Sequence, residues 1–306
     1  MTTCYYYKAF NLIIKSEELI IDELLNSEGS LNPDIIIKKS NSNEWPKLQN
    51  NQYSTPVLSI VPGDIRLDIK DICIFRILNG KYILWDPIYK KVNLSDIKTF
   101  LLGSPLGALL IQKNYLVMHG NALTKDNKAI ICLGKSGQGK STIAYILMKK
   151  GWKLLSDDIV AINEKGYVLP GIPRIKLWLD ALQYFKIDQK TLKKVRDNLQ
   201  KYVIKRSQLD IETREVKLEN FFIINRSFNK YVDEENLKIV SSESEMNTLL
   251  HLKNYYYRPI FVKGLEKEAL NFLNISKLLK KVKLSILPVP DKIEKLSAWI
   301  NHKKLF

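Results

Sequence analysis

Hydrophobic positions in the first 95 residues fall into short runs separated by polar turns. Tyr5 to Ile14 is apolar and β-prone, and a brief isoleucine run follows at Asp34 to Lys38. Asn41 to Pro56 is polar and contains two prolines, which predicts a loop. Ile72 to Leu78 and Lys81 to Trp85 flank Asn79-Gly80, the dipeptide most typical of a tight hairpin turn. We therefore expect residues 1–95 to form a β-rich N-terminal region.

The pattern changes to longer alternating elements after this region. Ser95 to Asn114 has apolar residues at helical spacing, with Ser95 as a candidate cap. We then expect strands at Tyr115–Leu123 and Lys128–Leu133, a helix at Ser141–Lys150 that Gly151 ends, and a strand within Trp152–Ile162. This order of strand, loop, helix and strand predicts a right-handed crossover and an α/β domain over residues 96–306.

The remainder of the chain carries weaker signals. We expect a helix around Thr191–Val203, strands at Phe221–Asn225 and Leu284–Val289, and a terminal helix from Asp291.

Composition narrows the class of protein. The 306 residues are 45% hydrophobic and 26% charged, as in soluble globular proteins. No run of about 18 uncharged apolar residues is present, so we expect no membrane span. The three cysteines include no CxxC pair, which favours reduced thiols in a cytoplasmic protein over disulfides or zinc.

The net charge of +16 raises nucleic acid as a partner. The lysines are spread in short pairs, however, and no aromatic-interleaved RNA motif is present. The same positive charge would also favour the binding of a nucleotide or an acidic peptide. We therefore treat nucleic acid as a minor alternative partner.

The segment from Gly134 to Ser141 fits the phosphate-binding pattern G-x-x-x-x-G-K-[ST] at every required position. It lies between a predicted strand and a predicted helix, which is the context the motif requires. Glycines let successive N–H groups point into one concavity, and the helix dipole adds positive charge there. The predicted nucleotide-binding residues are Gly134, Lys135, Ser136, Gly137, Gln138, Gly139, Lys140, Ser141 and Thr142.

This loop predicts ATP and Mg²⁺ as cofactors. Lys140 would bridge the β- and γ-phosphates, and the Ser141 hydroxyl would join the magnesium shell. Asp157 and Asp158 follow soon after, behind a strand expected at Leu154–Ser156 whose carboxyl end returns to the loop. One carboxylate can hold Mg²⁺ and the other can accept the proton of an attacking hydroxyl. The alternative for Asp157 and Asp158 is that they form a solvated turn or a helix cap without a catalytic role.

His119 precedes the loop strand in the segment Val117 to Ala122. A lone histidine on an apolar strand is most often structural.

Together, these segments resemble the HPr serine kinase/phosphorylase superfamily, which carries a histidine-glycine strand, a P-loop and a closely following Asp-Asp. They are similar in particular to its lasso-peptide kinase branch, which modifies ribosomal precursor peptides. The residues that carry this likeness are His119-Gly120, Gly134 to Ser141, Leu155 to Asp158, Leu101 to Ser104 with Gly107 to Leu110, Pro170 to Trp178, Lys205-Arg206 and Leu287 to Pro290.

The resemblance implies a role for each of these sites. Asp158 would be the general base with His119 as its hydrogen-bond partner, and Asp157 would support Mg²⁺ with Ser141. Lys140 would act in catalysis. Arg174, Lys205 and Arg206 are candidates for contacts with phosphate or with the acceptor, with solvated surface charge as the alternative. HPr kinases form oligomers, so a homo-oligomer is implied by resemblance only.

The sequence departs from HPr kinases at one place: Gly171 to Trp178 lies where they carry a metal-binding glutamate and a glycine-rich stretch. The function predicted is therefore transfer of the ATP γ-phosphate to a serine hydroxyl of a peptide. A kinase for free serine and a module that senses ATP without transfer are the alternatives.

Overall fold

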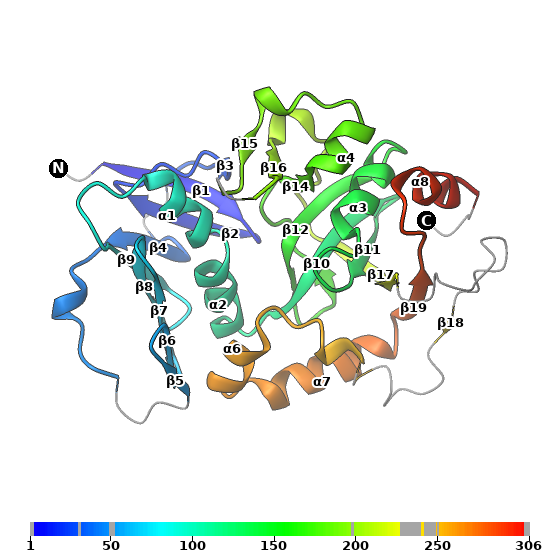
Figure 1. Cartoon of the computed structure of the whole chain (residues 1–306). Coiled ribbons are helices and arrows are strands. Elements are labelled where there is room, and N and C mark those ends of the chain that lie inside the picture. The colour runs from blue at the N-terminus through cyan, green and yellow to red at the C-terminus, as the bar shows by residue number, and fades with distance from the viewer. Residues whose placement is uncertain are drawn as a thin grey trace. The chain divides into compact units, whose positions relative to one another are not determined.

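The computed structural model describes residues 3–29, 32–48, 53–196, 199–226, 240–241, 249 and 251–302. The chain forms two compact units, and each includes more than one stretch of sequence (Figure 1). Unit 1 comprises residues 1–117, 161–164 and 256–274. Unit 2 comprises residues 118–160, 165–255 and 275–306.

Unit 1 is built on one large sheet with the strand order β3-β1-β2-β4-β9-β8-β7-β6-β5. Its strands are β1 (Cys4–Ala9), β2 (Leu12–Glu17), β3 (Leu25–Asn26), β4 (Ile35–Lys39), β5 (Tyr53–Thr55), β6 (Leu58–Val61), β7 (Asp64–Ile69), β8 (Cys73–Leu78) and β9 (Tyr82–Pro87). A 3-10 turn, η1 (Ser42–Glu44), lies after β4. The β-rich N-terminal region expected from the sequence is thus observed.

Two turns explain how the apolar runs become hairpins. β8 and β9 pair antiparallel around Asn79 and Gly80, which have φ values of 49° and 62°, as the Asn-Gly pattern requires. The run from Tyr5 to Ile14 is divided into β1 and β2 by a turn at Phe10 and Asn11. Alternate residues along β8, such as Phe75 and Ile77, are fully buried, which is the period of a strand with one face on the core.

The expected helix after this sheet is present as two helices, α1 (Leu94–Leu101) and α2 (Ser104–Gln112). The cap of α1 is Asn93, whose side chain accepts a hydrogen bond from the Ser95 amide, so the prediction of Ser95 as the cap was wrong. By length and composition the stretch Leu94–Gln112 could cross a membrane. Most of α2 is buried, however, and it packs against β8 and β9 as a core helix does. Unit 1 also contains α6 (Pro259–Gly264) and the start of α7 (Glu268–Leu279).

Unit 2 contains a mixed sheet with the strand order β11-β10-β12-β13-β17-β19-β18. Its strands are β10 (Leu116–Lys125), β11 (Lys128–Leu133), β12 (Lys153–Ile162), β13 (Tyr167–Val168), β17 (Val216–Asn225), β18 (Val240–Ser241) and β19 (Lys283–Pro288). β17 also pairs with β11, so the pairings from β11 through β10, β12 and β13 to β17 close into a ring. β11, β17 and β19 run parallel, whereas β10 and β11 are antiparallel.

Helices and a second, small sheet complete unit 2. The helices are α3 (Lys140–Met148), α4 (Leu179–Tyr184) and α8 (Ile293–His302), and the small sheet has the order β14 (Ile175–Trp178), β16 (Lys201–Ile204) and β15 (Lys193–Lys194). Short 3-10 turns are η2 (Gln189–Thr191) and η3 (Arg206–Gln208). One hydrophobic core joins the apolar faces of α3, α4 and α8 to β11, β17 and β19. The α/β class with a β-rich N-terminal region is confirmed.

One predicted element was wrong. The segment expected as a helix at Thr191–Val203 instead contributes β15 and β16. Val203 pairs with Lys176 of β14 and with Lys193 of β15, so sheet pairing outweighs a weak local preference for helix.

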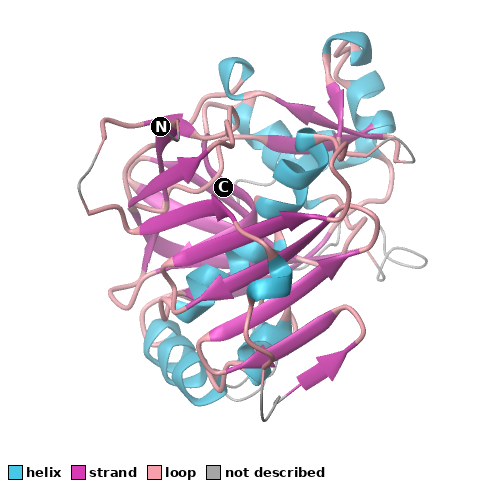
Figure 2. Cartoon of the chain, turned by 90° about the vertical axis from the view of Figure 1, so that its left-hand side faces the viewer, coloured by secondary structure: helices cyan, strands magenta, loops and turns pink. Residues whose placement is uncertain are grey.

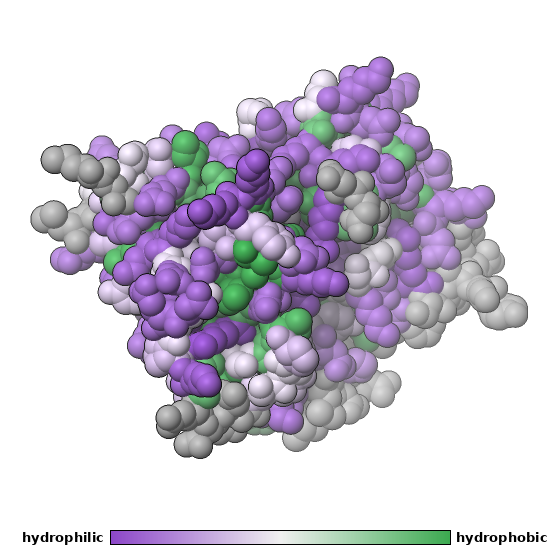
Figure 3. Space-filling view, turned by 60° about the vertical axis from the view of Figure 1, so that its left-hand side comes forward, coloured by the Kyte–Doolittle hydropathy of each residue, from purple (hydrophilic) through white to green (hydrophobic). Residues whose placement is uncertain are grey.

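Both units are built on β-sheets, and helices cover parts of them (Figure 2). On the face shown in Figure 3, hydrophilic residues predominate and hydrophobic residues gather only in small areas. Exposed large hydrophobic side chains such as Ile20, Tyr89 and Leu273 are scattered along the sequence, as is normal for protein surfaces.

Candidate nucleotide-binding and phosphotransfer site

The glycine-rich loop connects β11 to the N-terminus of α3, as its sequence pattern predicts. Gly137 and Gly139 have φ values of 83° and 89°, which side chains with a Cβ rarely adopt. Gly139 is the N-cap of α3, so the free amides of the first helical turn face the concavity of the loop. The cavity at this loop lies entirely within unit 2.

The Lys140 ammonium is turned into the loop. Its Nζ donates to the carbonyl oxygens of Gly134 and Lys135 at 2.7 and 3.1 Å. Burial lowers the pKa of Lys140, against the opposing influence of Asp157 and Asp158. The Lys135 amide donates to Gln138 Oε1 at 2.7 Å. These groups bond within the loop, so phosphate binding has to replace some of the contacts.

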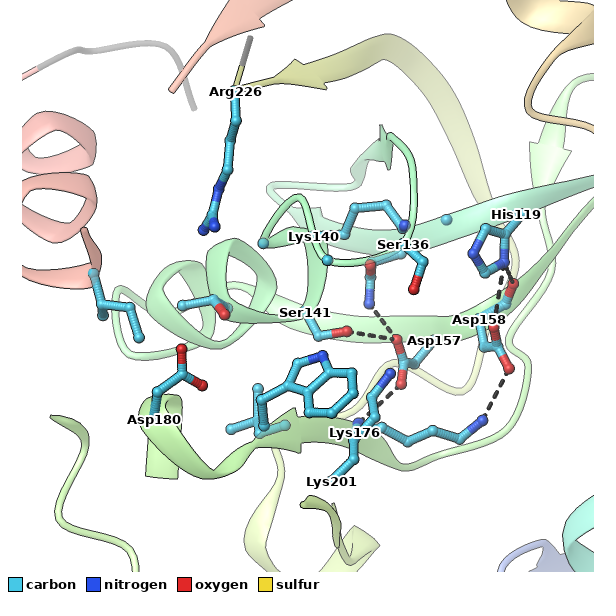
Figure 4. Close-up of a pocket in the computed structure, with 18 residues that line it drawn as sticks. His119, Ser136, Lys140, Ser141, Asp157, Asp158, Lys176, Asp180, Lys201 and Arg226 are labelled. Carbon is cyan, nitrogen blue, oxygen red and sulfur yellow. Dashed lines mark hydrogen bonds and ion pairs between the residues drawn. The ribbon is translucent and has the colours of Figure 1, made fainter. Parts of the chain in front are cut away.

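Asp157 is a buried carboxylate with donors on both of its oxygens. Oδ1 accepts hydrogen bonds from Asn121 Nδ2 and, at 3.4 Å, from Ser141 Oγ. Oδ2 accepts from the Lys176 amide at 3.0 Å (Figure 4). Burial raises the pKa of Asp157, although the nearby Lys176 and Lys201 oppose the shift. A cation bound beside a buried carboxylate would stabilise its ionised form.

Asp158 lies between two positively polarised groups. Its Oδ1 is 3.2 Å from His119 Nδ1, and its Oδ2 is 2.9 Å from Lys176 Nζ (Figure 4). Burial alone would raise the pKa of Asp158, but the Lys176 ammonium and His119 together hold it well below its usual range. His119 Nδ1 also lies 3.2 Å from the Asp158 carbonyl oxygen, so the Nδ1–H tautomer donates to Asp158.

The backbone at Asp158 explains how two consecutive carboxylates reach one cavity. The sequence predicts a strand at Leu154–Ser156 that ends before the pair, and this boundary was wrong because β12 continues to Ile162. Side chains alternate between faces along a regular strand. Asp158 has a φ of 75°, which interrupts this alternation, and both Asp157 and Asp158 line the cavity.

Three basic side chains in the cavity wall were not predicted as site residues. Lys176 comes from β14, Lys201 from the neighbouring β16, and Arg226 from the end of β17 (Figure 4). Lys201 Nζ lies 5.5 Å from the ring centroid of Trp178, whose side chain is 41% exposed and also lines the cavity.

Signals for some of these residues exist in the sequence. Arg226 directly follows a predicted strand, and the carboxyl ends of parallel strands meet at one sheet edge. Asn121 is two residues from His119, so the two share a face of β10. Nothing local distinguishes Lys201 from other lysines.

Most of the predicted nucleotide-binding and catalytic residues lie in the cavity wall, whereas the residues predicted to contact the acceptor do not. His119, Ser136, Gly137, Gly139 to Thr142, Asp157 and Asp158 line the cavity, while Gly134, Lys135 and Gln138 form the body of the loop. The described wall of the cavity does not include Arg174, Lys205 or Arg206. Arg174 is buried, and Lys205 and Arg206 are exposed at the end of β16.

The oxygen atoms beside Asp157 fit a magnesium ion. Mg²⁺ prefers oxygen ligands and is usually held by only one or two carboxylates. Ser141 Oγ and Asp157 lie together, and Asn121 Oδ1 is buried with no hydrogen-bond partner among the described residues. In the part of the chain that the structure describes, no group of three or more His, Cys, Asp and Glu gathers at one point.

The loop, its strand and its helix define a P-loop protein with a pair of carboxylates beside the loop. No family model matches the chain. Its sequence is similar to the HPr kinase/phosphorylase of Chlorobium phaeobacteroides (strain BS1), with 40% identity over 52 residues, which is 17% of this chain and 15% of that protein. It is 36% identical over 81 residues to the HPr kinase/phosphorylase of Mycoplasmopsis pulmonis (strain UAB CTIP), covering 26% of this chain and 25% of that one.

These matches confirm the predicted relation to the HPr kinase/phosphorylase superfamily over the matched segment. The matches span a quarter or less of the length of these curated relatives. A solved HPr(Ser) kinase/phosphatase from Coxiella burnetii is also similar, with a TM-score of 0.30 and 11% identity over 61% of this chain and 94% of that one.

Proposed function

We propose that this protein is an ATP- and Mg²⁺-dependent kinase that transfers the γ-phosphate to a serine hydroxyl of a peptide. The observation that carries the proposal is the position of Asp158, an ionised carboxylate held by His119 and Lys176 in the wall of the phosphate-loop cavity. A protein that only senses ATP has no need for such a group.

The loop and α3 supply the phosphate site. The amides at the start of α3 point at the bound anion, and Lys140 exchanges its loop carbonyls for the β- and γ-phosphate oxygens. Ser141, Asp157 and Asn121 would hold Mg²⁺, which neutralises charge on the phosphates.

Asp158 serves as the general base. A base must be unprotonated before reaction, and the depressed pKa of Asp158 keeps it so at neutral pH. Phosphoryl transfer has a loose transition state, so a weak base is sufficient because the hydroxyl becomes acidic only as transfer proceeds. His119 fixes the direction of the carboxylate through the Nδ1–H hydrogen bond.

The acceptor follows from the resemblance to the lasso-peptide kinase branch, and the basic side chains at the cavity are compatible with an acidic peptide. Lys176, Lys201 and Arg226 line the cavity and supplement the overall charge of +16. Arg174, Lys205 and Arg206 are placed outside the described cavity wall, so contacts between them and a peptide would involve parts of the peptide away from the reacting serine.

The experiment is transfer of radiolabel from the γ-position of ATP in the presence of Mg²⁺. A serine-ended peptide, free serine and HPr are offered in parallel to wild-type protein and to Asp158→Asn. We expect label on the peptide, reduced by about 100-fold or more in Asp158→Asn, with ATP binding retained. Asp210→Asn, an exposed aspartate elsewhere in unit 2, is the matched control.

Label on free serine alone would replace the peptide with a small-molecule acceptor. Equal labelling by Asp158→Asn would exclude Asp158 as the base. ATP binding without transfer to any acceptor would favour a nucleotide sensor.

A further inference from the structure

The phosphate-loop cavity contains a carboxylate that the proposed reaction does not use. Asp157 is the candidate magnesium ligand and Asp158 is the proposed base, whereas Asp180 lines the same cavity without an assigned role. A negative charge in a cavity that receives polyphosphate weakens binding, because like charges repel. A hydrogen-bond donor on the ligand that bonds to Asp180 would offset this repulsion.

The carboxylate of Asp180 is held in place by its own helix. Asp180 is the second residue of α4, which follows β14 directly, so the strand that supplies Lys176 also brings Asp180 to the cavity. Its Oδ1 accepts a hydrogen bond from the Ala181 amide at 2.8 Å. This bond leaves Oδ2 available to a ligand, and the residue is exposed. Asp180 therefore presents an oriented acceptor to the cavity.

The position of Asp180 within the cavity indicates which part of the nucleotide it meets. In Figure 4, Asp158 and His119 lie toward one end of the cavity and Asp180 lies toward the other, with Ser141 between them. In phosphoryl transfer the attacking oxygen and the leaving oxygen lie roughly in line. The acceptor hydroxyl approaches from the side of Asp158, so the leaving ADP extends away from it, toward Asp180.

The size of the cavity narrows the choice further. Its volume is about 180 Å³, whereas pockets that bury a whole small-molecule ligand usually measure about 300–1,000 Å³. The cavity therefore accommodates the phosphates and the group bonded to the α-phosphate, and the base lies outside it. That group is the ribose, whose two hydroxyls are hydrogen-bond donors that a carboxylate can accept.

We propose that Asp180 binds the ribose hydroxyls of the nucleotide and makes this site selective for ribonucleotides over deoxyribonucleotides. The inference rests on the proposed nucleotide binding, with Asp158 as the base. A carboxylate accepts strongly from a hydroxyl because the bond is assisted by its charge. An acidic side chain has the same role toward a ribose hydroxyl in dinucleotide-binding folds.

The test is calorimetric titration of ATP, 2′-deoxy-ATP, 3′-deoxy-ATP and inorganic tripolyphosphate into the full chain with Mg²⁺. We expect wild type to bind at least one deoxynucleotide about five- to ten-fold more weakly than ATP. Asp180→Ala should weaken ATP by a similar factor and cause no further loss for that deoxynucleotide, because the bond is already missing. Tripolyphosphate, which has no ribose, should lose no affinity.

The control Asp188→Ala removes a comparable carboxylate. Asp188 is exposed, and its Oδ1 accepts from a nearby backbone amide, that of Lys190, at 2.9 Å, but it does not belong to the described cavity wall. We expect this variant to bind all four ligands as wild type does. Asp180→Asn keeps an acceptor oxygen and loses the charge, so its loss of ATP affinity should be smaller than that of Asp180→Ala.

Circular dichroism and the melting temperature without nucleotide verify that each variant is folded. If Asp180→Ala does not fold, Asp180→Asn decides, with a loss for ATP and none for the deoxynucleotide. Wild-type affinity for ATP in the folded variant would overturn the proposal. Equal losses for ATP and both deoxynucleotides would overturn it too. A loss for ATP that inosine triphosphate escapes would assign Asp180 to the adenine amino group and overturn the choice of the ribose.

The two proposals fail separately. Ribose-dependent binding in a protein that labels no acceptor would leave Asp180 as a ribose ligand and remove the kinase. Labelling of a peptide by a protein that binds ATP and both deoxynucleotides equally would keep the kinase and remove the role of Asp180. Absence of ATP binding by wild type would overturn both.

Discussion

Lys176 holds both carboxylates of the site, since its Nζ lies 2.9 Å from Asp158 Oδ2 while its own amide donates to Asp157 Oδ2 at 3.0 Å. One residue of β14 therefore orients two consecutive side chains of β12. Replacement of the Lys176 side chain would affect Asp158 and leave the main-chain bond to Asp157 in place.

We expect Lys176→Met to shift the acid limb of the pH–rate profile to higher pH. The Lys176 ammonium is the main group that lowers the pKa of Asp158, and an opposite charge at this range lowers a carboxyl pKa by about 1–3 units. Without it, Asp158 protonates at a higher pH, and kcat/KM measured from pH 4 to 8 should decline earlier on the acid side. Lys153→Met, at an exposed position of β12, is the control.

The ion pair between Lys176 and Asp158 also stabilises the folded protein, and this stabilisation depends on pH in a defined direction. The pKa of Asp158 is lower in the folded state than in the unfolded state. The ionised Asp158 therefore stabilises the folded protein above the unfolded-state pKa, and this stabilisation is lost as the pH falls through the folded-state pKa. The melting temperature of Lys176→Met should therefore differ most from wild type at neutral pH and converge with it in acid. If Lys176→Met had the same pH dependence of kcat/KM and of melting temperature as wild type, the role assigned to this ion pair would be contradicted.

His119→Ala should reduce kcat and leave ATP affinity unchanged. The imidazole contacts both the carboxylate and the carbonyl oxygen of Asp158, so its loss misdirects the proposed base. We expect a decrease in kcat of about 10- to 100-fold, as for other groups that orient a reacting residue. His119→Asn should recover part of the activity because its amide nitrogen can donate from near the Nδ1 position. A raised KM for ATP with normal kcat would be the contrary result.

Asn121→Ala should weaken magnesium binding. Asn121 Nδ2 orients Asp157, and its buried Oδ1 has no partner among the described residues, so the substitution removes a candidate ligand and loosens another. We expect the Mg²⁺ concentration that gives half-maximal ATP binding to rise by about ten-fold or more.

Asn220→Ala is the matched control for Asn121→Ala. Asn220 also has a buried Oδ1 without a partner in the described part of the chain, but it lies on β17 and not in the cavity wall. If both variants change the magnesium requirement equally, Asn121 has no specific role in metal binding.

Gly107→Ala should destabilise unit 1. A Cβ at Gly107 would lie 2.3 Å from Cε1 of the buried Tyr257 ring, so α2 or the ring must move. Such overpacking costs about 1–3 kcal/mol, measured as the free energy of unfolding in denaturant. Tyr257→Leu in the same chain should relieve the clash, so the double variant should be more stable than the sum of the two single changes predicts. If the changes in the free energy of unfolding of the two single variants simply add in the double variant, the clash is not between Gly107 and Tyr257.

The order of elements around the loop was predictable because the signals are local. The glycine pattern, the strand Lys128–Leu133 before it and the helix after it all depend on residues close in sequence, and the structure has β11 and α3 there. The hairpin at Asn79-Gly80 was predictable for the same reason, since few residues adopt positive φ at both positions.

Elements that depend on partners far away in sequence were less predictable. Val203 lies in a strand because Lys176 and Lys193 are available to pair with it, and Thr191–Val203 was accordingly predicted wrongly as a helix. The cap of α1 was misplaced by two residues because Asn93 and Ser95 both suit an N-cap, and only the observed backbone selects Asn93.

The sequence by itself determined that this chain has a glycine-rich loop with the phosphate-binding pattern, with a histidine before it and two aspartates after it. Only the tertiary structure decided what these groups contact. The positive φ of Asp158 turns both carboxylates into one cavity, and β14, β16 and β17 bring Lys176, Lys201 and Arg226 to it. Loop geometry follows from neighbouring residues, whereas the charge around a carboxylate is set by strands that meet only when the sheets are paired.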